Sequence, residues 1–468
     1  MLLYRYCRCL ILGSMKMYHA ESGIAGSFLM PHPPVLVGAV GNGRESEALQ
    51  TLRACERVAA KIAELKPDTI IVISPHAPLF SDYLYVYGNN TLSGSFARFG
   101  ADSVTFSFSR DTELLDRFVE LLRSEGIPGG FLPGNGTARF DLNDEVDHGV
   151  LVPLYFVRDA YRNFSLAALS CSAFPPERVF RCGQLLARAA ATAGKRYCII
   201  ASGDMSHKVS RESPYGMVPS GAKFDQFIAS ALSASCPGRI LEVDPDIRSE
   251  AAECGYNSLV FLSGALDPEA SGIYAVSGLR SSLYSYEAPF GIGYCVAEIA
   301  RESSPVRIAR AAIESYVRTG SVPDSEELPS FDGESGGCFV SLHLNGELRG
   351  CIGTIAATAQ DIRSEILGNA IAACSRDPRF DPVQEEELEQ LEISVDILDK
   401  AEPVVSNKSL DPAEFGVIVT SGFKRGLLLP GLDGVDTVDE QLAIACRKAG
   451  IDQSAPYSIE RFSVTRYT

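Results

Sequence analysis

The stretch 68–80 reads DTIIVISPHAPLF, a run of β-branched and apolar residues that ends on Pro-His-Ala-Pro. A continuous apolar run of this length, bounded by a polar residue and a proline, is typical of a strand buried on both faces of a sheet. His76 then lies where the strand ends. In open α/β sheets the carboxyl ends of the strands form the edge at which ligands bind. The stretch therefore predicts an α/β fold with His76 at its ligand-binding edge.

The same alternation of strand and helix continues along the chain. Strands are predicted over 23–30, 69–74, 165–170 and 197–202, and amphipathic helices over 46–65, 112–126 and 176–194. Strands that alternate with helices of this length predict a mixed sheet covered by helices.

Three segments are predicted from changes in composition. Residues 1–22 form an extension that is disordered or precedes the true start, residues 23–302 form the α/β domain, and residues 303–468 form a separate α+β domain with its own core.

Composition narrows the classes of partner and compartment. The chain has 468 residues and a net charge of −17, so it lacks the concentrated positive charge that nucleic-acid binding requires. Its 13 cysteines contain no CxxC pair and indicate reduced thiols. The sequence contains no run of eighteen apolar residues, so it predicts no membrane-spanning helix. We expect a cytoplasmic protein that binds neither nucleic acid nor membranes.

Histidines gather at the predicted strand ends. The chain has only 6 histidines, and His32, His76 and His207 each follow a predicted strand. Parallel strands bring their carboxyl ends to one edge, so these three converge in space. His148 opens another apolar run and is a fourth candidate. Any one of these histidines, taken alone, could instead be a hydrogen-bonded loop residue without a functional role.

Neutral imidazoles are the commonest metal ligands, and two of them with one carboxylate form the facial arrangement of non-haem Fe(II) oxygenases. A third ligand must then come from another segment. The stretch RSEAAECGYNSLVFLSGAL offers Glu250, Glu253 and Cys254 just before a buried helix.

The ordered set PHPP, SPHAP, DHGVLVPL, SGDMSH and ECGYNSLVFLSGAL resembles the LigB-like catalytic subunit of class III extradiol dioxygenases and the related Memo family. The resemblance covers roughly residues 23–300 and implies a metal-dependent, oxidoreductase-like protein. It implies that His32 and His76 are metal ligands, that His207 is the acid/base that handles the catechol proton, and that His148 lines the substrate pocket.

The chain departs from the dioxygenases at the third ligand. Cys254 aligns with their glutamate, as in Memo proteins, and the adjacent Glu253 is the alternative ligand. A thiolate favours a softer metal. The resemblance to the dioxygenases implies Fe(II), and the thiolate keeps Zn or Cu as alternatives. Asp147 and Asp204 are expected to orient neighbouring histidines as hydrogen-bond acceptors.

A second candidate site lies in the C-terminal domain, in LRGCIGT (348–354). Arg349 would serve as an anion fork, Cys351 as a nucleophile, and Gly350 would let a ligand approach the backbone. The alternative is a tight turn with a buried thiol.

The motif LRGCIGT, together with SRDPRFDPV and LEISVDIL, resembles the AMMECR family over about residues 305–467. A polar cluster beside this loop would contain Arg376, Asp377, Arg379 and Phe380. The alternative is an Arg–Asp pair that serves only the domain itself.

Three functions follow from these observations. The first is a non-haem Fe(II) extradiol-dioxygenase-like enzyme that acts on an aromatic or related small molecule. The second is a Memo-like metal-binding or redox accessory protein without ring cleavage. The family resemblance implies a radical SAM protein as its partner, and the chain itself has no CxxxCxxC cluster motif. The third is a zinc-dependent hydrolase. A homo-oligomer is compatible with each of them.

Overall fold

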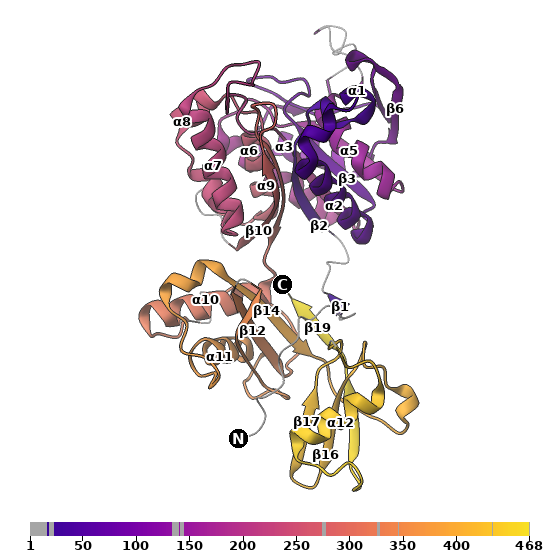
Figure 1. Cartoon of the computed structure of the whole chain (residues 1–468), viewed down its shortest axis with the longest axis vertical. Coiled ribbons are helices and arrows are strands. Elements are labelled where there is room, and N and C mark those ends of the chain that lie inside the picture. Colours follow the sequence, from indigo (N-terminus) through magenta and orange to yellow (C-terminus); the bar gives the residue numbers. More distant parts are fainter. Residues whose placement is uncertain are drawn as a thin grey trace. The chain divides into compact units, whose positions relative to one another are not determined.

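The computed structural model describes residues 16–17, 23–132, 140, 145–273, 278–324, 328–344, 346–432 and 434–467. The chain divides into two compact units (Figure 1). Unit 1 comprises 1–18 and 302–468, and unit 2 comprises 19–301.

Unit 2 is built on a six-stranded mixed sheet, as the sequence predicts. Its strand order is β10 (Leu279–Glu287), β11 (Tyr294–Arg301), β2 (Gly23–Met30), β9 (Arg196–Ser202), β3 (Thr69–Ser74) and β8 (Ser165–Ser170). Strands β2, β9, β3 and β8 run parallel, whereas β11 pairs antiparallel with both β2 and β10. The carboxyl ends of the four parallel strands therefore meet at one edge.

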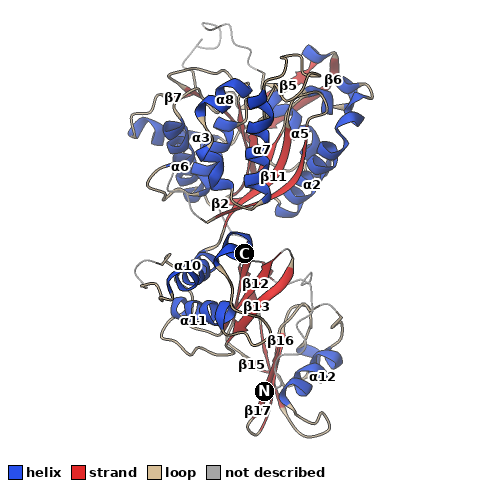
Figure 2. Cartoon of the chain, turned by 60° about the vertical axis from the view of Figure 1, so that its left-hand side comes forward, coloured by secondary structure: helices blue, strands red, loops and turns tan. Residues whose placement is uncertain are grey.

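Helices cover both faces of this sheet, which explains the apolar run that ends at His76 (Figure 2). Ile71 and Ile73 of β3 belong to one core, together with α3 (Thr112–Ser124), α6 (Pro176–Thr192) and α9 (Tyr256–Leu266). Ile70 and Val72 point the other way, into a core shared with α2 (Leu49–Leu65) and α5 (His148–Ala160). Because successive side chains enter opposite cores, β3 is buried at every position.

Further elements surround the sheet of unit 2. They are η1 (Pro34–Leu36), α1 (Gly38–Gly41), η2 (Arg44–Ala48), β4 (Leu84–Tyr85), β5 (Thr91–Phe96), η3 (Ala97–Phe99), β6 (Ala101–Ser109), β7 (Gly129–Gly130), α7 (Pro219–Ser233), η4 (Pro237–Glu242) and α8 (Pro245–Ala251).

Unit 1 contains two sheets and three helices among its described residues. One sheet has the order β1 (Lys16–Met17), β19 (Val464–Tyr467), β14 (Leu391–Leu398), β12 (Cys338–Leu344) and β13 (Glu347–Gly353). The other has the order β15 (Glu402–Pro403), β18 (Ser458–Phe462), β16 (Gly416–Ser421) and β17 (Lys424–Leu428). The helices are α10 (Ser304–Thr319), α11 (Ile362–Ser375) and α12 (Val438–Ala449), with 3-10 turns η7 (Glu385–Gln390) and η8 (Asn407–Ser409).

This separate α+β unit agrees with the predicted fold class. In the predicted extension 1–22, the described residues are Lys16 and Met17, which pair in parallel with Thr465 and Arg466. The remainder of that extension, including His19, lies outside the described residues.

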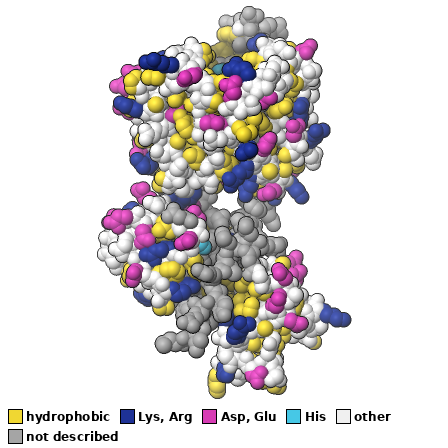
Figure 3. Space-filling view, in the orientation of Figure 1, with side chains coloured by type: hydrophobic (Ala, Val, Ile, Leu, Met, Phe, Trp, Pro, Cys, Tyr) yellow, Lys and Arg dark blue, Asp and Glu magenta, His cyan; other side chains and the backbone are white. Residues whose placement is uncertain are grey.

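Cysteines in the interior carry free thiols, among them Cys55, Cys198, Cys295, Cys374 and Cys446. No helix of the described ranges is long and apolar enough to cross a membrane. On the face of unit 2 seen in Figure 3, basic side chains lie scattered among acidic and apolar ones.

Two glycines bring the end of β9 against the start of α9. A Cβ on Gly203 would lie 2.2 Å from the Cα of Gly255, and a Cβ on Gly255 would lie 3.0 Å from the carbonyl oxygen of Asp204. The two loops touch through their backbones because neither residue has a side chain. This contact places Cys254 at the sheet edge.

We expect Gly203→Ala to lower the free energy of unfolding of unit 2 by about 1–3 kcal/mol, because the added methyl group forces the two backbones apart. Denaturant unfolding measures this loss. Gly272→Ala is the matched control, since a Cβ there meets nothing within 4 Å. Equal stability of the two variants would contradict the contact.

Candidate metal centre

Histidines from three segments meet at the carboxyl edge of the sheet. His32 follows β2, His76 follows β3, and His148 is the first residue of α5. The ring centroids of His32 and His76 lie 4.7 Å apart, and those of His76 and His148 lie 4.2 Å apart. His32 is buried, at 1% exposure. Of the three histidines expected to converge, His32 and His76 lie together here, and the third ring of this group is that of His148.

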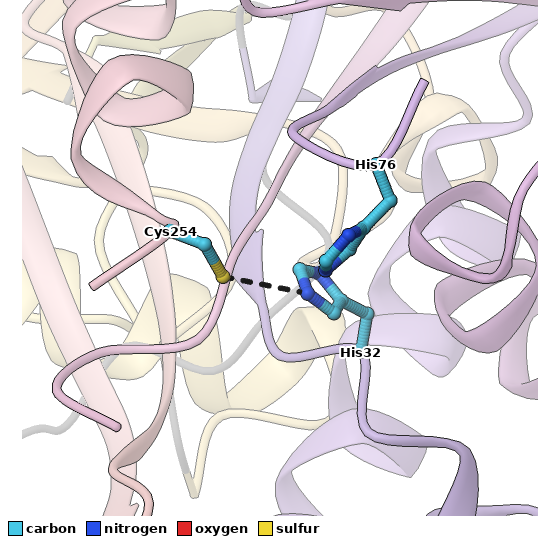
Figure 4. A group of neighbouring side chains, drawn as sticks. All are labelled: His32, His76 and Cys254. Atoms are coloured by element: carbon cyan, nitrogen blue, oxygen red, sulfur yellow. Dashed lines mark hydrogen bonds between the residues drawn. The ribbon is translucent and has the colours of Figure 1, made fainter. Parts of the chain in front are cut away.

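Cys254 completes a group that could hold a metal ion. One ligand atom from each of His32, His76 and Cys254 can be chosen so that all three lie within 4.8 Å of one another. Figure 4 shows the two imidazoles and the thiol directed toward one space, with the Cys254 sulfur 3.5 Å from Nε2 of His32.

Main-chain hydrogen bonds hold Cys254 in place. The backbone N–H groups of Cys254 and Gly255 both donate to the carbonyl oxygen of Asp204, at 3.3 and 3.0 Å. The N–H of Asp204 in turn donates to the Cys254 sulfur at 3.3 Å. The thiol is therefore fixed by the same loop that follows β9.

The two glutamates that compete with Cys254 in the sequence are engaged elsewhere. Glu253 accepts the backbone N–H of Tyr256 at 2.6 Å, in the first turn of α9, and its other oxygen lies 3.9 Å from Arg248 Nε. Glu250 is exposed and accepts the hydroxyl of Ser220. Among the three candidates, the described structure groups Cys254 with the two histidines.

His148 and His207 flank this group. The ring centroid of His148 lies 5.6 Å from that of His32 and 5.4 Å from that of Phe99. The ring of His207, in the loop after β9, stacks on that of Tyr215, with the ring centroids 5.4 Å apart. Besides burial, the positive charge of His76 helps to lower the pKa of His207, and that of His207 helps to lower the pKa of His32. Both residues thus present imidazoles next to the three candidate ligands.

The two predicted acidic supports accept hydrogen bonds from backbone N–H groups and from hydroxyl groups. Asp204 accepts the backbone N–H of His32 at 2.9 Å. Asp147 caps α5 by accepting the N–H of Gly149 at 2.7 Å, and it also accepts the hydroxyl of Ser74 at 2.6 Å. The imidazole of His32 has a different partner, Ser202, whose Oγ lies 2.8 Å from Nδ1.

Ser202 and Ser74 are supporting residues that the sequence reasoning missed. A usable signal exists, because the predicted strands TIIVIS, SLAALS and YCIIAS all end in serine. A hydroxyl group at the last position of a buried strand must find a partner, and here the neighbouring partners belong to the histidine loops.

Burial shifts the pKa values of several groups of the site toward their neutral forms. Burial, with neighbouring histidines, lowers the pKa of His32 well below its usual value, and burial together with His76 lowers the pKa of His148 to about 4. Burial raises the pKa of Asp204 and of Glu253 to about 7 and raises the pKa of the Cys254 thiol. Neutral imidazoles are ready to coordinate, whereas the thiol must lose its proton when a metal binds.

These donors fit a transition metal. Imidazole suits Zn, Cu and Fe, and thiolate favours the softer members of that series. His32, His76 and Cys254 would hold the ion. His32 is buried, Cys254 is partly buried and His76 is exposed, and hydrogen bonds hold the backbone of each of the three residues.

The candidate site in unit 1 has a different character. Arg349 donates through Nε and Nη2 to Glu387 at 2.7 and 3.0 Å, and through Nη1 and Nη2 to the carbonyl oxygens of Asp381 and Pro382. Four of its five N–H donors are thereby used within the unit. The guanidinium ties β13 to the segment before β14, and the role of Arg349 as an anion fork stays a prediction.

Asp377 and Arg379 clamp the backbone of Cys351. Asp377 accepts the Cys351 N–H at 2.8 Å and pairs with Arg379, which also donates to the Cys351 carbonyl at 3.0 Å. The Arg–Asp pair within the domain is therefore present. The Cys351 sulfur accepts the hydroxyl of Ser341 at 3.3 Å.

The other predicted members of this cluster are accounted for separately. A Cβ on Gly350 would lie 2.4 Å from the carbonyl oxygen of Ala373, so this glycine is required for packing β13 on α11. Arg376 is the exposed C-terminal cap of α11, and the Phe380 ring lies under the Arg379 guanidinium.

Comparison with known proteins agrees with this geometry. Residues 26–297 match the family model described as the catalytic LigB subunit of aromatic ring-opening dioxygenase. The chain belongs to the LigB family. Residues 306–468 match the AMMECR1 family model, so the predicted fusion of a LigB/Memo-like unit with an AMMECR unit is confirmed.

Relatives carry one or both parts. Protein CA_C1420 of Clostridium acetobutylicum is 36% identical over 94% of this chain and 98% of its own length. A protein of Thermotoga maritima is 49% identical over 35% of this chain and 95% of its own length. Among solved structures, the uncharacterized protein PH0010 of Pyrococcus horikoshii matches 35% of this chain and 88% of its own, with 30% identity and a TM-score of 0.32. The uncharacterized protein JW3007 of Escherichia coli K12 matches 58% of this chain and 98% of its own, with 18% identity and a TM-score of 0.38.

Arg349→Ala is expected to destabilise unit 1 by about 1.5–3 kcal/mol, because it leaves the half-buried Glu387 carboxylate without its charged partner. Amide hydrogen exchange in β12 and β14 measures the loss. Arg425→Ala removes an exposed pair with Glu460 and should cost less than about 1 kcal/mol. A reversed order would contradict the structural role of Arg349.

The lowered pKa of His148 predicts a pH dependence of stability in the metal-free protein. Between pH 6.5 and about 4, the unfolded chain binds a proton at residue 148 that the folded chain excludes. The free energy of unfolding therefore falls as the pH falls through this window, with a contribution from this residue of up to about 3 kcal/mol.

His148→Gln should make this decline shallower, which denaturant unfolding at several pH values would show. At pH 8 neither side chain carries a charge, so the stability difference measured there serves as the reference. A decline of equal slope in both proteins would contradict the buried, neutral state of His148.

Proposed function

We propose that unit 2 is a metal-dependent, extradiol-dioxygenase-like oxidoreductase that acts on an aromatic or related small molecule, with Fe(II) as its metal. The observation that carries this proposal is the grouping of His32, His76 and Cys254 at the ligand-binding edge of a LigB-family sheet. Zn and Cu remain compatible with the same donors.

The bound metal would supply a Lewis-acidic, redox-active centre for an aromatic diol and dioxygen. Ring opening would place both oxygen atoms of the dioxygen in the product. The chain's own residues would do the rest. His148 and His207 have lowered pKa values, chiefly through burial, so each stays neutral and can accept a proton from a substrate hydroxyl. Phe99 beside His148 and Tyr215 on His207 offer aromatic surfaces to a planar molecule.

A specific observation favours a second candidate. The third donor is the thiol of Cys254, and a thiolate favours softer metals and is itself open to oxidation. This supports a Memo-like metal-binding or redox accessory protein without ring cleavage, with a radical SAM protein as its partner. The AMMECR unit in the same chain fits such a multi-component system.

Metal analysis tests the part that both candidates share. Anaerobically prepared protein should bind about one Fe(II) per chain, and His76→Ala or Cys254→Ala should weaken binding by more than about 100-fold, since losing a ligand costs more than losing a support. His343→Ala, a histidine of β12 in unit 1, is the matched control and should bind like the wild type. Wild-type protein without metal, or variants that bind equally, would refute the site.

Oxygen consumption separates the two candidates. The iron-loaded wild type should consume oxygen with a catecholic substrate, and His207→Gln should reduce turnover by about 100-fold or more if it provides the acid/base. Full metal loading without oxygen consumption across a broad panel would exclude ring cleavage. Copurification of a radical SAM protein would then support the accessory role.

A further inference from the structure

Three neighbouring parallel strands end in a buried serine at the ligand-binding edge. Ser74, Ser170 and Ser202 are the last residues of β3, β8 and β9, and each is fully buried. Ser170 accepts the backbone N–H of Tyr85 at 3.1 Å. The other two serines contact the loops that carry the candidate metal ligands.

The hydroxyl of Ser202 lies between two groups that constrain its single proton. Its Oγ is 2.5 Å from the carbonyl oxygen of Gly149 and 2.8 Å from Nδ1 of His32. A carbonyl oxygen only accepts, so the short Oγ–O contact needs the hydroxyl proton. Nothing is then left to donate to His32, and Nδ1 must itself carry a proton.

We infer that Ser202 is a positioning residue that holds His32 as its Nδ1-protonated tautomer and so directs the lone pair of Nε2 toward the space shared with His76 and Cys254. Nε2 is the atom that lies 3.5 Å from the Cys254 sulfur. The importance of this tautomer for metal binding rests on the proposed function. The tautomer itself follows from the hydrogen bonds alone.

The first turn of α5 joins this support to that of the other histidine. The carbonyl of Gly149 accepts from Ser202, and its N–H donates to Asp147, which accepts the hydroxyl of Ser74. Ser74 Oγ accepts the backbone N–H of His76 at 3.1 Å. A Cβ on Gly149 would lie 2.3 Å from Ser74 Oγ, so residue 149 has to be glycine for the turn to sit this close. One helical turn thereby braces both imidazole ligands.

Nitrogen NMR of the histidine rings tests the tautomer directly. The full chain, deuterated and metal-free, is labelled with 15N-histidine, and the His32 signals are assigned by their loss in His32→Gln. We expect the proton on Nδ1 in the wild type and in Ser170→Ala, and a mixture or the Nε2-protonated form in Ser202→Ala. Ser202→Thr keeps the hydroxyl and should restore the wild-type pattern. The wild-type spectrum alone would overturn the inference if it showed His32 protonated on Nε2 or on both nitrogens.

Metal affinity tests the consequence, with Co(II) as the probe. Ser202→Ala should weaken Co(II) binding about 10–100-fold, as loss of an outer-shell partner does, while Ser170→Ala and Ser202→Thr should stay within about threefold of the wild type. Unchanged affinity in Ser202→Ala would overturn the positioning role. If the wild type binds no metal but shows the Nδ1 proton, the proposed function fails and the tautomer assignment stands.

Discussion

Burial of the parallel strands on both faces is the constraint on which the rest of unit 2 depends. Because Ile70 to Ile73 enter two separate cores in turn, β3 cannot shift its register without moving apolar groups into the wrong layer. The position of the strand end is therefore fixed. His32 and His76 each follow a strand end within two residues, so the cores determine where the imidazoles lie.

That same burial determines the chemistry of the site. It disfavours every charged form, so imidazoles, the Cys254 thiol and the nearby carboxyl groups of Asp204 and Glu253 are all shifted toward neutrality. A divalent cation reverses this balance, because it brings the charge that stabilises a thiolate. The energy of metal binding thus has to offset the release of a proton from a buried thiol.

Much of this arrangement could be predicted from the sequence. The mixed sheet and the convergence of His32 and His76 follow from strand periodicity and from the rule that parallel strands share a ligand-binding edge. The residues alone left Cys254 as one of three candidates for the third ligand, because its position depends on the backbone contact between Gly203 and Gly255. Local periodicity carries no information about such a contact between distant loops.

The supports were harder to predict than the ligands. The hydrogen bonds of Ser202 reach Gly149 and His32, which are distant in sequence and adjacent only in the folded sheet. For Arg349, the motif gave no sign of the partner Glu387, which lies 38 positions away. A charged side chain in a loop motif can serve a ligand or its own domain, and only the folded structure distinguishes the two.

The structure also explains why a thiol and not the adjacent carboxylate faces the histidines. Glu253 accepts the N–H of Tyr256, one of the first-turn donors of α9 that have no partner within the helix. Turning its carboxylate toward His32 would leave that buried donor unsatisfied. The hydrogen bonds from the backbone N–H groups of Cys254 and Gly255 to the carbonyl oxygen of Asp204 hold the main chain in this position. The orientation of Cys254 toward the histidines therefore depends on the β9–α9 junction as well as on residue 254 itself.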